Sequence, residues 1–183
     1  MHLKETREPT EKTTIGILAY GSLIHPEEFS RKEIVGVIPV KVRGFKRLFN
    51  QKPSWRKGEG NRIGVLNVEP SHEHVINAVC LCFESEHPEE LNTRERGYTQ
   101  LQVVAEHIEC YPGHELPEAI ECYLFMGKEE MRRHDILPNC DYLSICMSGA
   151  KEWGERFYEE FVETTYLANG SKLAHYGPVG SES

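Results

Sequence analysis

The sequence lacks a hydrophobic run long enough to cross a membrane. No stretch of 18 or more apolar residues occurs, so we expect no transmembrane helix. The first thirteen residues are polar and charged and contain no apolar segment of the kind that marks a secretory signal. These two absences favour a cytoplasmic protein that does not act at a membrane.

An excess of positive charge is also missing. The chain carries 21 Lys and Arg residues against 29 Asp and Glu residues, which gives a formal net charge of −8. A chain this acidic repels phosphate groups, both in nucleic acids and at anionic membrane surfaces. We therefore expect neither nucleic acid nor membrane among its partners.

Cysteine is present six times, but no two cysteines form a Cys-x-x-Cys pair. The spacing of a common zinc finger is thus absent. Cys80, Cys82, Cys110 and Cys122 lie in or beside segments with the pattern of strands. In a reducing compartment such residues are best interpreted as buried thiols.

What remains is the composition of one ordinary globular domain. The chain has 183 residues, 39% of them hydrophobic and 27% charged, which is enough to bury a core without disulfides or metals. We find no internal repeat and no linker. The expected organisation is a flexible lead over residues 1–13, a single domain over residues 14–167 and a C-terminal tail over residues 168–183.

The hydrophobic pattern predicts strands first and helices last. Short apolar or alternating runs indicate strands at residues 15–20, 34–50, 63–68, 75–83, 101–109 and 119–125. Residues 88–96 are typical of one or two helical turns. Asn139 or Asp141 could cap a helix that contains Tyr142, and residues 152–167 have the spacing of an amphipathic helix.

No long helix separates consecutive strands, which argues against a doubly wound parallel sheet. The expected fold class is α+β, with a curled, mostly antiparallel mixed sheet or small barrel and short flanking helices.

One motif of chemical interest is Ala-Tyr-Gly-Ser-Leu-Ile-His-Pro at residues 19–26. A buried strand ends here in a turn, and successive backbone N–H groups of such a turn can point at one anionic group. Glycine permits the close approach of a ligand. Taken alone, the motif is equally consistent with a tight turn that binds nothing.

A second motif is Leu-Asn-Thr-Arg-Glu-Arg-Gly-Tyr at residues 91–98, in which Glu95 stands between two arginines. Taken alone, it is consistent with a solvated turn held by surface ion pairs.

The two motifs together, in their order along the chain, resemble the gamma-glutamylcyclotransferase superfamily. A Tyr-Gly-Ser-Leu turn, a Gly-Phe-x-Arg segment and a glutamate shortly before Gly-Tyr are similar to the ChaC-like branch. Tyr142-Leu143 followed by Gly-Ala-Lys-Glu at residues 149–152 is similar to the gamma-glutamylcyclotransferase branch itself. The resemblance extends over residues 15–152 as ordered pieces.

This resemblance implies an intramolecular aminolysis that releases 5-oxoproline from a γ-glutamyl compound, namely glutathione, a γ-glutamyl amino acid or a γ-glutamyl amine. It implies Glu95 as the catalytic acid/base, with Tyr20, Gly21, Ser22, Leu23, Tyr98 and Tyr142 as substrate-binding residues. Such a reaction requires no cofactor and no metal. Arg47 and Arg94 could contact a substrate carboxylate, and residues 51–61 could determine the leaving group. The oligomeric state cannot be inferred from the sequence.

Three alternatives stay open. A cysteine nucleophile would need an activated thiol beside a histidine, but no nucleophile motif surrounds any cysteine. His72 and His74 could reach one metal ion, although their segment is typical of a polar surface turn. The non-enzymatic alternative is a binding module that holds a small acidic metabolite in the same pocket. Glu95 argues against it, because a carboxylate repels an anion.

Overall fold

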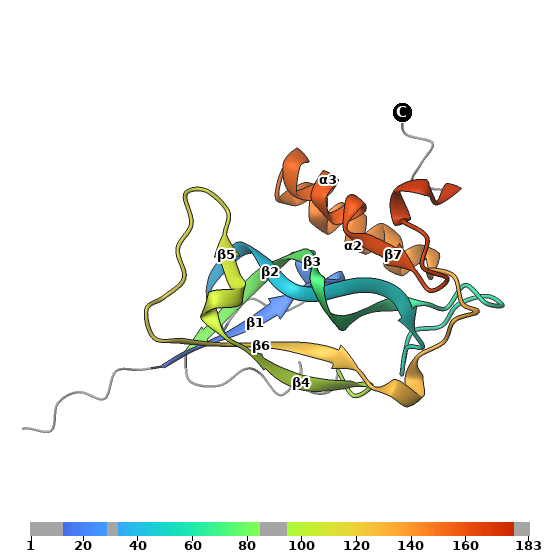
Figure 1. The fold of residues 1–183 in the computed structure, drawn as a ribbon, viewed down its shortest axis with the longest axis horizontal. Helices are drawn as coiled ribbons and strands as arrows, with labels where there is room; N and C mark the ends of the chain where they lie inside the picture. The colour runs from blue at the N-terminus through green and yellow to red at the C-terminus, as the bar shows by residue number, and fades with distance from the viewer. Residues whose placement is uncertain (1–12, 29–32, 85–94, 178–183) are drawn as a thin grey trace, which may run out of the picture.

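The computed structural model describes residues 13–28, 33–84 and 95–177. Within them lie seven strands, two α-helices and four 3₁₀ turns (Figure 1). The strands are β1 Thr14–Ala19, β2 Ile34–Gln51, β3 Val65–Glu84, β4 Tyr98–Val103, β5 Ile108–Cys110, β6 Ile120–Gly127 and β7 Thr165–Leu167. The helices are α2 Cys140–Glu152 and α3 Glu155–Glu163, and the 3₁₀ turns are η1 Ser22–Ile24, η2 Ala105–His107, η3 Glu129–Met131 and η4 Leu173–His175.

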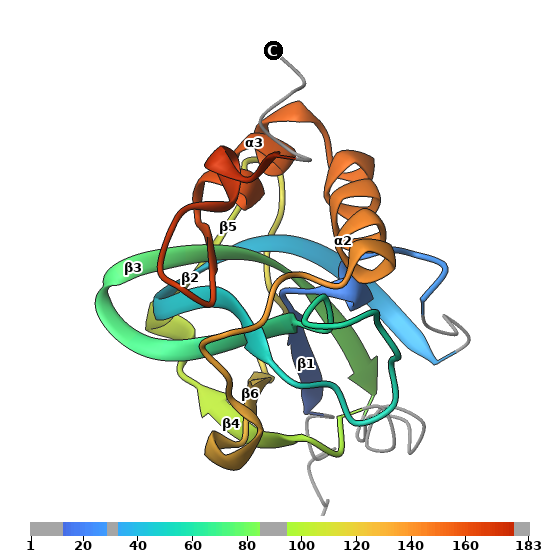
Figure 2. The same cartoon turned by 90° about the vertical axis from the view of Figure 1, so that its right-hand side faces the viewer.

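The described strands form one mixed sheet in the order β4-β6-β1-β3-β2-β5, and β7 pairs with β2. Pairing is parallel between β1 and β6 and between β2 and β7, and antiparallel elsewhere. Figure 2 shows the strong curl of β2 and β3 and places both helices on the same side of the sheet. The expected α+β class with a curled, mostly antiparallel sheet is confirmed.

Strand β3 differs from the sequence-based prediction. Residues 63–68 and 75–83 were expected as two strands with a polar turn between them, but one continuous strand runs from Val65 to Glu84. Its partner β2 is equally long, and their register changes from Arg43 opposite Val75 to Phe45 opposite Pro70. The polar residues 71–74 are therefore accommodated as a bulge, opposite Gly44 at φ +92°.

The alternating run at residues 101–109 is likewise not one strand. β4 ends at Val103, a 3₁₀ turn follows, and β5 starts at Ile108. β4 pairs with β6, whereas β5 pairs with β2 at the other edge of the sheet. Strict apolar–polar alternation stops at Val103-Val104-Ala105, and this is where the chain leaves β4 for the other edge of the sheet.

The two C-terminal helices are confirmed, with shifted ends. Asn139 caps α2, because its side-chain oxygen accepts a hydrogen bond from the backbone N–H of Tyr142 at 3.0 Å. The predicted helix over residues 152–167 is shorter than expected. Gly154, at φ +99°, separates α3 from α2, and the chain after Thr164 enters β7.

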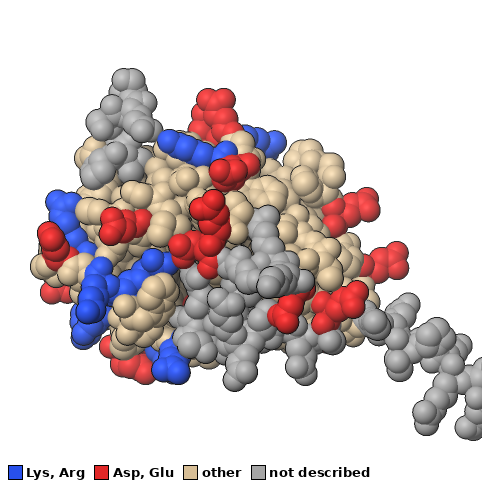
Figure 3. Space-filling model, turned by 180° about the vertical axis from the view of Figure 1, so that it is seen from behind, with Lys and Arg blue, Asp and Glu red and all other residues tan. Residues whose placement is uncertain are grey.

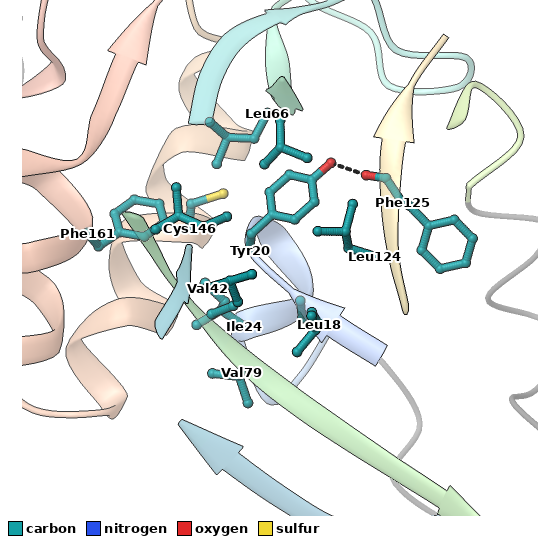
Figure 4. Packing of buried hydrophobic residues seen from close by; sticks show 14 of the residues in the cluster. Leu18, Tyr20, Ile24, Val42, Leu66, Val79, Leu124, Phe125, Cys146 and Phe161 are labelled. Atoms are coloured by element: carbon teal, nitrogen blue, oxygen red, sulfur yellow. Dashed lines mark hydrogen bonds between the residues drawn. The ribbon is translucent and has the colours of Figure 1, made fainter. Parts of the chain in front are cut away.

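The core lies between the curled sheet and the helices. Figure 4 shows part of it, where Tyr20, Leu66, Leu124 and Cys146 pack together. Leu173, from the segment expected as a tail, is fully buried in the same core. Among the described residues, no helix is both long and apolar enough to span a membrane.

Candidate functional site

A pocket opens where β1 ends. All seven residues that the resemblance implies as catalytic or substrate-binding line it, namely Tyr20, Gly21, Ser22, Leu23, Glu95, Tyr98 and Tyr142. Residues 53–56, from the loop after β2, line it as well. The fold thus brings together four segments that are far apart in the sequence, namely residues 20–23, residues 53–56, Glu95 with Tyr98, and Tyr142.

The turn at residues 20–23 forms one wall of the pocket. Two backbone hydrogen bonds close it, from Ile24 N–H to Gly21 O at 3.1 Å and from His25 N–H to Ser22 O at 3.0 Å. A Cβ atom on residue 21 would lie only 2.5 Å from the hydroxyl oxygen of Tyr142. Glycine is therefore required here because Tyr142 packs directly against the backbone of the turn.

Three tyrosines surround the pocket. The hydroxyl of Tyr20 donates to the carbonyl of Phe125 (Figure 4), and that of Tyr98 donates to the carbonyl of Leu66 at 2.7 Å. Burial raises the pKa of Tyr20, Tyr98 and Tyr142 well above 10, and the nearby charge of Glu95 raises each of these pKa values further. All three are therefore neutral hydroxyl groups at physiological pH.

Glu95 lies partly buried at the start of a turn that leads into β4. Its carbonyl accepts a hydrogen bond from Tyr98 N–H at 3.0 Å. The next carbonyl but one, that of Gly97, accepts bonds from Gln51 Nε2 at 3.0 Å and from Lys128 N–H at 2.9 Å. These bonds fix the turn to β2 and to the residue that follows β6, so the backbone that carries Glu95 is anchored. Most of the helical segment expected at residues 88–96 lies outside the described residues.

Arg47 does not contact the pocket as a substrate ligand would. It is fully buried and donates to both oxygens of Asn77, at 2.7 and 2.8 Å, and to Thr165 Oγ1 at 2.8 Å. It also donates to the carbonyl of Tyr20 at 3.3 Å. Burial lowers its pKa to about 9, which leaves it protonated at neutral pH. Its role is to hold the base of the 20–23 turn. Arg94, the other arginine named as a possible contact of a substrate carboxylate, lies outside the described residues.

The loop at residues 53–56 supplies pocket residues to which the sequence assigned no individual role. Trp55 is 54% exposed. Arg56 lies with its guanidinium carbon 4.4 Å from the Trp55 ring centre and 5.1 Å from that of Tyr142. It also donates to Glu28 Oε2 at 2.7 Å. In the sequence, the only sign of the contact between Arg56 and Tyr142 was a Trp-Arg pair in a glycine-containing loop.

The alternatives gain no support from the geometry. In the part of the chain that the structure describes, no group of three or more His, Cys, Asp or Glu side chains could hold a metal ion. His74 is engaged with Ser71 Oγ at 2.6 Å and with the ring of Tyr166. Burial raises the pKa of Cys146, the thiol near Tyr142, to about 12, so it is not an activated nucleophile.

Charge on the surface is mixed. On the face shown in Figure 3, acidic side chains are spread among basic ones, and the basic ones gather toward one side. This face therefore offers no uniform basic surface over its described residues.

Comparison with known proteins supports the fold. No family model and no curated protein sequence matches the chain. Among solved structures, a gamma-glutamyl cyclotransferase is similar at 17% identity and a TM-score of 0.58, over 81% of this chain and 86% of the other. A yeast gamma-glutamyl cyclotransferase specific to glutathione has 16% identity and a TM-score of 0.60, over 83% of this chain and 97% of the other.

A third structure, an uncharacterized protein from Homo sapiens, has 17% identity and a TM-score of 0.60 over 92% of this chain and 97% of the other. Identities this low establish the shared fold and not a shared substrate. The chain therefore has the gamma-glutamylcyclotransferase-like fold.

Proposed function

We propose that this protein is a gamma-glutamylcyclotransferase-like enzyme that releases 5-oxoproline from a γ-glutamyl compound, with Glu95 as its acid/base. One observation carries the proposal. Glu95 lines the same pocket as the 20–23 turn, although the two segments belong to distant parts of the chain. The fold shared with gamma-glutamyl cyclotransferases supports the same reaction class.

The proposed reaction begins when the Glu95 carboxylate accepts a proton from the α-ammonium group of the substrate. The neutral amine then attacks the carbonyl carbon of the γ-amide in the same molecule, and a new C–N bond closes a five-membered ring. Glu95 gives its proton to the leaving nitrogen and takes up the second proton of the ring nitrogen. The tetrahedral oxyanion then collapses, the original C–N bond breaks, and the released amine takes that proton from Glu95 and departs as an ammonium ion. The products are 5-oxoproline and a free amine or amino acid, and Glu95 ends as it began.

The pocket suits this substrate in two ways. The Glu95 carboxylate attracts the α-ammonium group before it accepts its proton. The backbone N–H groups of Gly21, Ser22 and Leu23 are our candidates to hold the oxyanion or the α-carboxylate. The neutral tyrosines provide a shaped and partly dry wall that limits the orientations of the γ-glutamyl group, so that amine and carbonyl are held ready to react.

The test is release of 5-oxoproline from glutathione, several γ-glutamyl amino acids and several γ-glutamyl amines. We compare the wild type with Glu95→Gln and with Glu130→Gln, a change at an exposed glutamate outside the pocket. The wild type should turn over at least one compound, Glu95→Gln should lose about a hundredfold or more in kcat, and Glu130→Gln should be unchanged.

Two outcomes would replace this proposal. Full activity of a folded Glu95→Gln variant would remove Glu95 from the chemistry. Absence of turnover on every compound, with 5-oxoproline or glutamate still bound by the folded protein, would favour the binding module.

A further inference from the structure

The pocket contains one basic side chain among its described lining residues, and this is Arg56. Glu95 is the one acidic side chain of that lining. A γ-glutamyl substrate carries an ammonium group, an α-carboxylate and, in some compounds, a second carboxylate on the leaving group. The pocket therefore has a basic group that the proposed acid/base chemistry does not use.

Arg56 is held in place on three sides. Trp55 and Tyr142 present their rings to its guanidinium group, and Glu28 accepts a hydrogen bond from its Nη2 atom. Arginine has five N–H donors in a planar fork, which matches the two oxygens of a carboxylate. A fork fixed by stacking loses little conformational freedom when it binds such a group, so the site is preorganised.

The position of Arg56 in the pocket indicates which carboxylate it meets. Tyr20 and Tyr142, at 7% and 6% exposure, form the floor, whereas the Arg56 side chain is 15% exposed and its neighbour Trp55 is 54% exposed. The loop at residues 53–56 thus forms the rim. The γ-glutamyl group has to reach Glu95 and the 20–23 turn, and the leaving group has to depart toward solvent.

We infer that Arg56 is a specificity-determining residue that binds a carboxylate on the leaving group. The preferred substrates are then γ-glutamyl amino acids or short γ-glutamyl peptides, and uncharged γ-glutamyl amides and amines are poorer substrates. This inference rests on the proposed function. It adds a substrate class, because the reaction itself does not require a carboxylate on the leaving group. The α-carboxylate, by contrast, is common to all γ-glutamyl compounds and does not distinguish them.

The experiment uses two substrates that differ only in the charge of the leaving group, γ-glutamyl-alanine and γ-glutamyl-alanine amide. We measure kcat/KM of both with the wild type, Arg56→Gln and Arg62→Gln. Arg62 is exposed, lies outside the pocket and carries the same charge, so it controls for overall electrostatic steering. The wild type and Arg62→Gln should prefer the acid, and Arg56→Gln should reduce that preference by about 10- to 100-fold, mainly by losing activity on the acid.

A second variant separates recognition from loop stability. Glu28→Gln breaks the ion pair that holds Arg56 but keeps the guanidinium group, so the preference for the acid should persist. Thermal unfolding shows whether Arg56→Gln remains folded. Equal losses of kcat/KM on both substrates with Arg56→Gln would mean that Arg56 binds the α-carboxylate. Unchanged kcat/KM on both substrates would mean that it binds neither carboxylate. Both results overturn the inference.

Failure of the proposed function is recognised separately. If the wild type turns over neither compound, calorimetric binding of the two compounds to the wild type and to Arg56→Gln still decides the role of Arg56. A selective loss of acid binding would support the carboxylate site without an enzyme. Equal binding of acid and amide, or no binding of either, would overturn it.

Discussion

Substituting Gly21 with alanine tests the packing on which the pocket depends. The new methyl group would lie 2.5 Å from the hydroxyl oxygen of Tyr142 and 3.6 Å from Cβ of Leu66. The second distance is an ordinary contact, whereas the first is closer than two non-bonded atoms approach. Nearly all of the strain therefore falls on one atom pair.

Tyr142 cannot easily move away. Its ring is almost completely buried and meets the ring of Phe49 edge-on, with the centroids 6.1 Å apart. Overpacking at such a site costs about 1–3 kcal/mol. The loss of chain entropy in the unfolded state returns about 0.4–1 kcal/mol for a glycine-to-alanine change. We therefore expect Gly21→Ala to lower the free energy of unfolding by about 1–2 kcal/mol.

A double-mutant cycle measured by urea unfolding isolates the cause. Tyr142→Phe removes the hydroxyl oxygen that the methyl group would meet, so Gly21→Ala should cost less in that background, with a coupling of about 1 kcal/mol. Additive effects within about 0.5 kcal/mol would refute the steric argument. So would a Gly21→Ala protein as stable as the wild type.

Two further predictions concern buried polar groups. Arg47→Met leaves several buried acceptors, including both oxygens of Asn77, without their donor. It should lower the free energy of unfolding in urea by about 3 kcal/mol or more, whereas Arg43→Met, at an exposed arginine, should lower it by less than about 0.5 kcal/mol. Equal effects of the two substitutions would contradict the buried network. At alkaline pH, Tyr20 and Tyr142 have folded pKa values raised above the unfolded value of about 10, so their stabilising contribution is complete below pH 10 and falls by about 2.7 kcal/mol per pH unit above it. Ultraviolet absorbance of tyrosinate should therefore appear for these two residues only with unfolding, and their titration in the folded state would contradict their burial.

The sequence predicted well the strands whose pattern follows from local burial. β1 and β6 are short apolar runs, and each lies within a residue or two of its expected bounds. Asn139 was predicted as one of two possible caps because its side chain acts within the next three residues. Such features depend on neighbours along the chain, so they can be read without knowledge of the tertiary structure.

Features that depend on distant partners were missed or misread. Residues 71–74 have the composition of a turn, but pairing with β2 at Val75 and at Pro70, on either side of them, makes them a bulge within one strand. Arg56 has no local signal that distinguishes it from its loop neighbours, since only the packing of the loop on Tyr142 brings it to the pocket. The shared location of Glu95 and the 20–23 turn was expected from the family resemblance rather than from periodicity, and their catalytic and binding roles stay predictions.

The buried Arg47 has a consequence for the order in which the protein is made. Its guanidinium group ties Tyr20, near the beginning of the chain, to Phe161, Thr164 and Thr165, near the end. A ribosome exposes the first of these residues long before the last, so a growing chain holds a charged group whose final acceptors have not yet been synthesised. It follows that the pocket wall beside Tyr20 reaches its final form only when α3 and β7 have emerged and docked.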